Sequence, residues 1–185
     1  MRITREEYEA VAARAELLVS GAGIEQALDQ MAEAITASLG DRDPLVLCVM
    51  TGGVPVVGRL LHRLRFPLRL SYIHATRYRG ATSGGSLEWR YRPSGAIRGE
   101  HVLVVDDILD AGLTLEAVVA ACREDRAASV HSAVLVEKVR ERPSDCRADF
   151  VGLHLPDRYL YGCGLDYKGY FRNADGIYAV ASQDV

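Results

Sequence analysis

The sequence is poor in the features that mark secreted, zinc-binding and membrane-spanning proteins. It has four cysteines in 185 residues, and none is spaced as Cys-x-x-Cys, which argues against a zinc site and a disulfide framework. Cys48 and Cys122 lie in apolar segments typical of buried positions. No stretch approaches the ~20 apolar residues that are needed to cross a bilayer.

The first residues lack the pattern of a secretion signal. Met1–Glu16 is rich in Arg and Glu and has no apolar core, so we expect no signal peptide and a cytoplasmic protein. The net charge is −3, and a weakly acidic chain does not indicate a nucleic-acid surface. We therefore expect neither a nucleic-acid partner nor a membrane partner.

The pattern of apolar residues predicts alternating helices and strands. A chain of 185 residues with 49% hydrophobic residues fits one domain with a buried core. Thr4 and Glu7 have the spacing of a capping box, which predicts a first helix that continues to about Val19. Further on, the pattern predicts helices at 24–39, 54–64 and 114–124 and strands at 45–50, 68–75, 102–105, 130–136, 149–153 and 177–181. This alternation favours an α/β fold with a twisted, mainly parallel sheet that binds ligands at the carboxyl ends of its strands.

One segment departs from this alternation. The stretch from Tyr78 to Gly99 is rich in Gly, Ser, Arg and Thr around a possible hairpin strand at Ser86–Arg92. Long polar insertions in compact domains are usually functional lids or disordered segments. We therefore expect a mobile lid over 78–99, with Trp89 in its hairpin.

The segment Val102–Thr114 carries the clearest chemical signal. Four apolar residues predict a buried strand, Asp106 and Asp107 follow at its end, and a turn that contains Gly112 opens a helical pattern. Backbone N–H groups at such a helix N-terminus suit a phosphate. Paired carboxylates suit the hydroxyl groups of a sugar or Mg²⁺, because both prefer hard oxygen ligands. The sequence therefore predicts a ribose-phosphate site with the capacity to bind a metal.

This segment resembles the phosphoribosyl-pyrophosphate (PRPP) motif of the type I phosphoribosyltransferases. The motif normally has Thr at the position of Ala111, which is the one departure. A second run, Leu155–Tyr167, resembles the purine-binding segment of hypoxanthine-guanine phosphoribosyltransferases, and Lys138 and Arg172 match residues of that family that lie outside the run. The resemblance extends from about Val46 to Val180 and implies the type I phosphoribosyltransferase fold with a small hood.

The resemblance implies a role for each matching residue. Asp110 would act as general base at N7 of the purine, and Mg²⁺ would be bound by Asp106, Asp107 and Asp166. The PRPP site would consist of Asp106, Asp107, Ile108, Leu109, Ala111, Gly112, Leu113 and Thr114. The purine would contact Lys138, Arg158, Tyr159, Leu160 and Asp166, and the pyrophosphate would contact Thr51, Gly52, Tyr78 and Arg172.

Several of these residues also allow simpler interpretations. Lys138 could be a surface lysine of the charged turn Glu137–Pro143, and Arg172 could be an ordinary surface arginine. Tyr161 is expected in the core. Lys often stands at the position of Thr51 and Ser at that of Arg77, so the backbone, or Arg77 with Arg79, would have to bind the pyrophosphate. None of the five histidines has the spacing of a metal ligand or catalytic triad.

The expected enzyme transfers 5-phosphoribosyl from PRPP to N9 of hypoxanthine or guanine, with Mg²⁺, and releases pyrophosphate. Two alternatives stay open: a transferase that prefers xanthine, and a non-catalytic regulator that senses PRPP or a nucleotide. The resemblance also implies small-molecule substrates and a homodimer or homotetramer. Within the single domain 1–185 we expect a helical N-terminal segment at 1–40 and, at 153–185, a purine-binding hood with a C-terminal strand.

Overall fold

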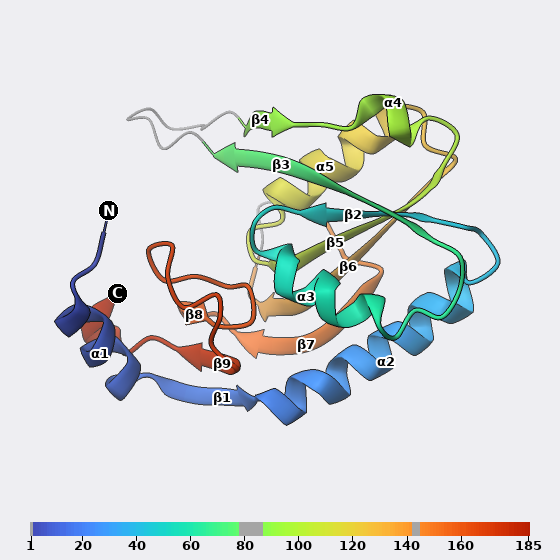
Figure 1. The fold of residues 1–185 in the computed structure, drawn as a ribbon. Helices are drawn as coiled ribbons and strands as arrows, with labels where there is room; N and C mark the ends of the chain where they lie inside the picture. Colours follow the sequence, from blue (N-terminus) through green and yellow to red (C-terminus); the bar gives the residue numbers. More distant parts are fainter. Residues whose placement is uncertain (1, 78–86, 142–144) are drawn as a thin grey trace.

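The centre of the molecule is a six-stranded sheet between helices (Figure 1). The computed structural model describes residues 2–77, 87–141 and 145–185. The strand order is β4-β3-β2-β5-β6-β7, and all neighbours are parallel except β3 and β4. The strands are β2 (Leu45–Val49), β3 (Arg69–Arg77), β4 (Leu87–Tyr91), β5 (His101–Leu109), β6 (Ser129–Val139) and β7 (Phe150–Pro156). The predicted α/β fold with a mainly parallel sheet is confirmed.

The strands are apolar on both faces because helices cover both faces. In β2, Val46 and Cys48 pack towards α2 (Gly21–Leu39) and α3 (Gly53–Leu61). The alternate residues Leu45, Leu47 and Val49 pack with α5 (Leu113–Glu124) and the short α4 (Ser94–Ile97). This accounts for the continuous apolar runs of the central strands, which the sequence predicts within a few residues of their ends.

A second, three-stranded sheet in the order β1-β9-β8 forms the hood. It consists of β1 (Glu16–Ser20), β8 (Leu160–Tyr161) and β9 (Gly176–Ala179), and it lies beside α1 (Arg5–Arg14) and the 3₁₀ helix η1 (Ser182–Asp184). Figure 1 shows the hood on the side of the molecule to which the arrowheads of the parallel strands point. The hood therefore lies at the carboxyl ends of the strands, where ligands are expected.

The prediction of one helix from Thr4 to Val19 is wrong beyond Arg14. Residues Glu16–Ser20 form β1, in which Leu17 pairs with Tyr178 and Val19 with Ile177 of β9. The Ser20 hydroxyl then accepts a hydrogen bond from the N–H of Gly23 at 3.2 Å and caps α2, which begins at Gly21 rather than Ile24. A short apolar run is compatible with helix or strand, and here pairing with a distant strand decides.

The hood has its own aromatic core. Tyr8 of α1 stacks on Phe171 with ring centroids 4.0 Å apart, and Tyr161 packs against both Phe171 and Tyr178. Tyr161 is 2% exposed, so its expected place in the core is confirmed. The N-terminal helix and the C-terminal segment thus fold together.

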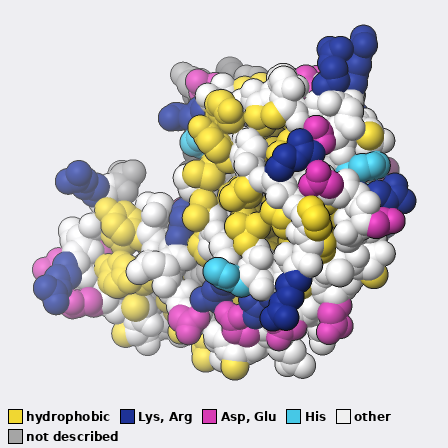
Figure 2. Space-filling model, turned by 45° about the vertical axis from the view of Figure 1, so that its right-hand side comes forward, with side chains coloured by type: hydrophobic (Ala, Val, Ile, Leu, Met, Phe, Trp, Pro, Cys, Tyr) yellow, Lys and Arg dark blue, Asp and Glu magenta, His cyan; other side chains and the backbone are white. Residues whose placement is uncertain are grey.

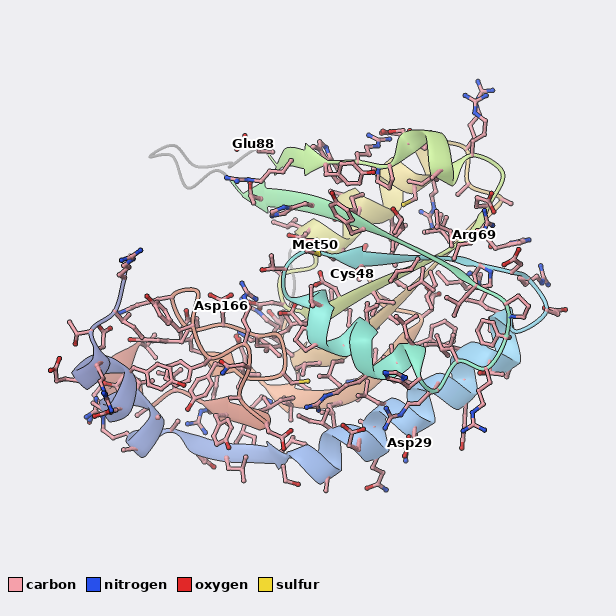
Figure 3. The ribbon with its side chains drawn as sticks, viewed as in Figure 1. Asp29, Cys48, Met50, Arg69, Glu88 and Asp166 are labelled. Carbon is pink, nitrogen blue, oxygen red and sulfur yellow. The ribbon has the colours of Figure 1, made fainter. Side chains whose placement is uncertain are left out.

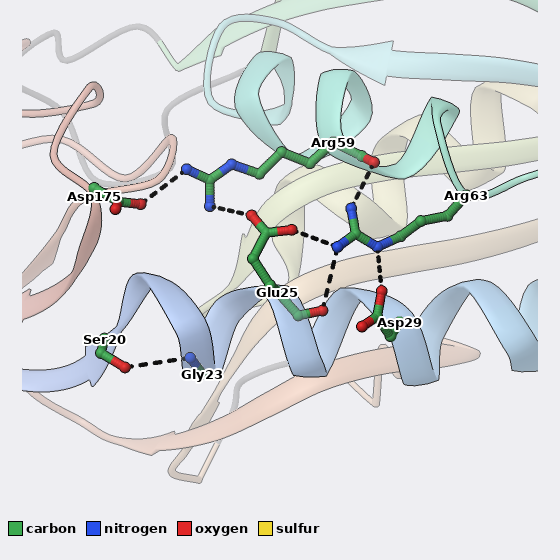
Figure 4. A network of polar contacts seen from close by, with 7 residues as sticks. All are labelled: Ser20, Gly23, Glu25, Asp29, Arg59, Arg63 and Asp175. Carbon is green, nitrogen blue, oxygen red and sulfur yellow. Dashed lines mark hydrogen bonds and ion pairs between the residues drawn. The ribbon is translucent and has the colours of Figure 1, made fainter.

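Ion pairs connect the hood to the main body (Figure 4). Arg59 of α3 contacts Asp175 near β9 at 3.0 Å and Glu25 of α2 at 3.2 Å. Arg63, one helical turn further on, contacts Glu25 and, at 2.6 Å, Asp29. Arg59 therefore links α3 to both α2 and the hood, whereas Arg63 links the end of α3 to α2 alone.

The hairpin strand and the charged turn both have bounds that differ from those predicted from the sequence. The strand expected within the lid is confirmed as β4, while residues 78–86, and with them Tyr78 and Arg79, lie outside the described residues. The charged turn begins later than expected, because Glu137 and Lys138 still belong to β6, which pairs with β7 as far as Val139.

No helix among the described residues is long and apolar enough to cross a membrane.

The surface charges are mixed. Figure 2 shows one face on which hydrophobic side chains gather in the middle while acidic and basic side chains alternate along the lower edge. The described residues drawn on this face form no continuous basic patch of the kind that binds nucleic acid.

Candidate active site

A cavity of about 260 Å³ lies where β5 leads into α5. It is lined by Asp106, Asp107, Ile108, Leu109, Asp110, Ala111, Gly112, Thr114 and Leu115. Gly112 has φ +82°, a left-handed conformation that favours glycine, and it lets the chain turn directly into the helix at Leu113. The backbone N–H groups at the start of α5 are thereby available to an anion. The structure brings together every residue predicted for the PRPP site except Leu113, which is exposed.

Asp106 and Asp107 are buried carboxylic acids, only 7% and 8% exposed. They lie within β5 rather than after it, because the strand continues to Leu109. The Asp106 carboxylate accepts a hydrogen bond from the Asp107 N–H at 2.9 Å. Burial, together with repulsion from Asp107, raises the pKa of Asp106 well above its ordinary value. Burial also raises the pKa of Asp107, against the opposing effect of Arg172. Such shifts are typical of functional sites.

Two glycines allow three chain segments to meet at Asp107. A Cβ atom on Gly52 would lie 2.1 Å from a carboxylate oxygen of Asp107. One on Gly164, which has φ +106°, would lie 2.2 Å from the carbonyl oxygen of Gly52. Three segments therefore pack closely at this point: the loop after β2, the end of β5 and a loop of the hood. Gly164 was not singled out from the sequence, although its place in the Leu155–Tyr167 run is a signal that could have found it.

A second cavity of about 220 Å³ lies between the strand ends and the hood. Its lining consists of Asp107, Ile108, Asp110, Lys138, Tyr159, Leu160, Leu165 and Asp166. All of these residues except Leu165 were predicted to bind substrate or metal. They come from β5 and its loop, β6 and the hood, so one cavity collects residues that are distant in sequence.

Lys138 is a buried residue with two acidic partners, so its interpretation as a surface lysine is wrong. It is 7% exposed, and its Nζ lies 3.3 Å from Oδ2 of Asp110 and 3.4 Å from Oδ1 of Asp157. Asp110 also contacts Nη1 of Arg140 at 2.8 Å. Arg140 and Asp157 were assigned no role from the sequence, since Arg140 belongs to a charged run that is typical of a solvated surface.

Tyr159 offers a partly exposed ring to this cavity. The ring is 38% exposed and meets the edge of Tyr167 with centroids 5.6 Å apart. Tyr167 in turn donates a hydrogen bond from its hydroxyl to the carbonyl oxygen of Asp184 at 2.9 Å. An aromatic face held in this way suits the stacking of a flat base.

Arg172 and Asp166 form a pair beside Asp107. Nη2 of Arg172 lies 2.6 Å from Oδ1 of Asp166, and Nη1 lies 3.8 Å from Oδ2 of Asp107. The other Asp166 oxygen accepts a hydrogen bond from the N–H of Gly169 at 2.7 Å. Asp166 belongs to the loops of the hood (Figure 3). Arg172 therefore contacts two residues that line the second cavity.

Arg158 and Thr51 are among the predicted residues that line neither cavity. Arg158 forms an ion pair with Glu16 of β1 and does not line the second cavity. Thr51 is exposed on the loop between β2 and α3. Among the described residues, no group of three or more His, Cys, Asp or Glu side chains is arranged to hold a metal ion.

Comparison with known proteins identifies relatives of one kind. Residues 16–168 match the model of the phosphoribosyl transferase domain. The hypoxanthine-guanine phosphoribosyltransferase of Bacillus subtilis is 30% identical over 158 residues, which cover 85% of this chain and 88% of that protein. The hypoxanthine-guanine-xanthine phosphoribosyltransferase of Tritrichomonas foetus is 32% identical over 151 residues, covering 81% and 82%.

A solved structure shows the same arrangement of elements. The hypoxanthine phosphoribosyltransferase of Trypanosoma cruzi, in complex with its product IMP, superposes with a TM-score of 0.83 at 28% identity. The superposition covers 92% of this chain and 95% of that one. The predicted type I phosphoribosyltransferase fold is confirmed.

Proposed function

Because this chain belongs to the phosphoribosyl transferase family, and is a purine phosphoribosyltransferase by its relatives, we propose that it transfers 5-phosphoribosyl from PRPP to N9 of hypoxanthine or guanine. Pyrophosphate is the leaving group, and IMP or GMP is the product. The observation that carries this proposal is the second cavity, in which Asp110, Lys138 and Tyr159 meet beside the phosphate-binding loop.

The 5′-phosphate is bound by the loop at the start of α5. The backbone N–H groups from Ala111 to Thr114 and the Thr114 hydroxyl are the donors, and the partial positive charge of the helix N-terminus adds to their attraction. Ala111 lacks the hydroxyl of the usual Thr but keeps its backbone N–H. Asp106 and Asp107 bind the ribose hydroxyls, while Thr51, Gly52 and Arg172 face the pyrophosphate.

The base is held by Tyr159 and Lys138. Tyr159 stacks on the ring, which contributes roughly 1–3 kcal/mol in comparable base–aromatic contacts. Lys138 donates to O6, which selects oxopurines because an amino group at that position would face an ammonium group. Backbone groups of Leu160 and Asp166 contact the opposite edge of the base.

Asp110 handles the proton at N7. As N9 bonds to C1 of the ribose, the imidazole part of the purine gains positive charge. A carboxylate at N7 stabilises that charge and accepts the proton, a contribution of roughly 10²–10⁴ in rate for general bases.

The carboxylates fit a divalent cation that also binds the substrate. Mg²⁺ usually takes one or two protein carboxylates and completes its shell with water and substrate phosphates. Asp106 and Asp107 are suited to one such ion and Asp166 to a second. When bound, Mg²⁺ stabilises the negative charge of the departing pyrophosphate.

A purine panel tests the proposal. Pyrophosphate release is measured with PRPP, Mg²⁺ and each of hypoxanthine, guanine, xanthine and adenine, and a reaction without purine serves as the control for hydrolysis. We expect high kcat/KM for hypoxanthine and guanine and low kcat/KM for adenine. Comparable values for adenine would overturn the role of Lys138.

Xanthine is the second candidate, because the Tritrichomonas foetus relative carries it in its name. A kcat/KM for xanthine above those of hypoxanthine and guanine would establish that preference. We further propose a homodimer or homotetramer in the cytoplasm, which sedimentation of the purified protein and fractionation of cells would test.

A further inference from the structure

Four side chains around Asp110 form a closed ring of alternating charges. Asp110 contacts Nζ of Lys138 at 3.3 Å and Nη1 of Arg140 at 2.8 Å. Asp157 contacts the same two nitrogens, each at 3.4 Å. We call Asp110, Lys138, Asp157 and Arg140 the charged ring.

The sheet register brings the outer pair of the ring together. Lys138 pairs with Leu155 and Val139 with Pro156 in the parallel ladder of β6 and β7. Arg140 and Asp157 are the next residues on the two strands, so they leave the sheet side by side. Asp110 follows β5, the other neighbour of β6 in the sheet, so the ring is built at the ends of three adjacent strands.

Only half of the ring faces the purine cavity. Asp110 and Lys138 line it, whereas Arg140 and Asp157 do not. A purine that binds Nζ of Lys138 through O6 and Oδ2 of Asp110 through N7 would replace the contact between Lys138 and Asp110. The shorter contact, between Arg140 and Oδ1 of Asp110, would remain in place.

We propose that Arg140 is a positioning residue for the purine, an inference that rests on the proposed function of this site. It holds Oδ1 of Asp110 and thereby directs Oδ2 to the base. When the purine separates Lys138 from Asp110, Arg140 still neutralises the charge of Asp110, and Asp157 still neutralises the charge of Lys138. Without Arg140, Lys138 becomes the only cation of the ring, and it pairs more firmly with Asp110. The base must then compete for both groups.

Two variants and a control test this role. Arg140→Met keeps the aliphatic stem and removes the charge, and Arg140→Lys restores a charge without the planar fork. Arg42→Met serves as the matched control, because Arg42 lies in the turn before β2 and pairs only with Asp41 among the described residues. The measurements are kcat and KM for hypoxanthine at saturating PRPP, KM for PRPP, and the melting temperature.

For Arg140→Met we expect kcat/KM for hypoxanthine to fall about 10-fold, less than the roughly 100-fold that a 1 Å misplacement of a reacting group can cost, because Lys138 still contacts Asp110. The KM for PRPP should stay within about 2-fold, because its ligands lie elsewhere. Arg140→Lys should recover most of the loss, and Arg42→Met should match the wild type. The side chain of Arg140 is 34% exposed, so we expect all three variants to fold.

Other outcomes would overturn the inference. One is a kcat/KM for hypoxanthine in Arg140→Met that equals the wild-type value. Another is a loss that Arg140→Lys does not relieve and that accompanies a lower melting temperature, because it would show a purely structural role. A wild-type protein that is inactive with every purine would overturn the proposed function and the inference together. An active wild type with an unaffected Arg140→Met would overturn the inference alone.

Discussion

At the scale of single residues, Asp110 is the group on which the proposed chemistry depends most directly. It lines both cavities, and its two oxygens contact different cations. Asp110→Asn keeps the shape and removes the charge, so kcat should fall by roughly 10²–10⁴. PRPP affinity, measured by calorimetry, should change little, because the phosphate ligands in the proposed function are backbone groups and Thr114.

The control for this prediction is Asp41→Asn, which removes a carboxylate from an exposed turn. It should leave both kcat and PRPP affinity unchanged. Near wild-type turnover of Asp110→Asn in a single-turnover experiment would contradict the role of Asp110 as the base.

Asp106 shows how a functional residue can oppose stability. Its pKa is raised in the folded protein by burial and by Asp107, so the native state retains the proton at pH values where the unfolded chain has lost it. Stability should therefore fall as pH rises from the unfolded value of about 4 through the folded pKa. Asp106→Asn removes this penalty, and its amide oxygen can still accept from the Asp107 N–H.

We expect Asp106→Asn, freed of metal by a chelator, to be more stable than the wild type by roughly 1 kcal/mol at pH 8. The difference should shrink as the pH is lowered towards 4. Thermal melts of both proteins across this range provide the measurement, and a variant that is less stable than the wild type at pH 8 would refute the prediction.

Local motifs explain why most site residues could be predicted. Asp106 to Thr114 form one continuous segment whose chemistry is visible in its order. Arg140 is different, since in sequence it is one charge among several between Glu137 and Arg142. Arg140 meets Asp157 through the register of β6 and β7, and it meets Asp110 through the pairing of β5 with β6. Register is a property of the folded sheet.

At the scale of elements, the glycines differ in how much room their surroundings leave for a side chain. A Cβ atom on Gly164 would meet the carbonyl oxygen of Gly52 at 2.2 Å, whereas one on Gly58 in α3 would meet nothing within 4 Å. Gly164→Ala should therefore destabilise the protein. Gly58→Ala should stabilise it by roughly 0.5–1 kcal/mol, because alanine restricts the unfolded chain and favours helix.

Urea unfolding of the two variants provides a matched comparison, since both add one methyl group to the same kind of residue. Opposite shifts of the midpoint are expected. Equal shifts in the same direction would mean that the hood does not pack on the loop after β2 as described.

The first helix illustrates how a distant partner holds an element in place. Tyr8 stacks on Phe171 with an angle of 7° between the rings, and α1 also contacts the hood through Glu7 and Lys168 at 2.9 Å. An aromatic pair of this kind contributes about 0.5–1.5 kcal/mol beyond the burial of area.

Tyr8→Ala should therefore lower the free energy of unfolding by about 1–2 kcal/mol, the pair energy together with the lost burial. Glu9→Ala, which removes an exposed side chain of the same helix, should cost less than about 0.5 kcal/mol. Equal effects of the two changes would show that α1 does not depend on the aromatic contact.

At the scale of the whole molecule, the main sheet could be predicted, but of the hood sheet only the strand near the C-terminus could be predicted. Buried parallel strands read as continuous apolar runs, and helices between them follow from periodicity. The hood sheet combines residues 16–20, 160–161 and 176–179, and of these segments only the last has a pattern that predicts a strand. The run Leu17–Val19 therefore looked like the end of a helix, and the two residues of β8 were too few to recognise.

The expectation of a single domain can be tested through the cysteines. Burial raises the pKa of Cys48 and of Cys122 to about 11 and also raises the pKa of Cys163. Cys146, by contrast, is partly exposed. Because the thiolate is the reactive form, iodoacetamide at pH 8 should modify the native protein at Cys146 first.

The three buried thiols report on different parts of the fold. Cys48 packs under α2 and α3, and Cys122 lies on α5 and packs in the other hydrophobic cluster. Cys163 lies in a loop of the hood but belongs to the same hydrophobic cluster as Cys48. If main body and hood unfold as one cooperative unit, all three should be modified at one common rate, which rises in parallel with urea. Mass spectrometry of the labelled peptides measures each rate. Faster modification of Cys163 alone would show that the hood opens independently, and the chain would then consist of two units instead of one.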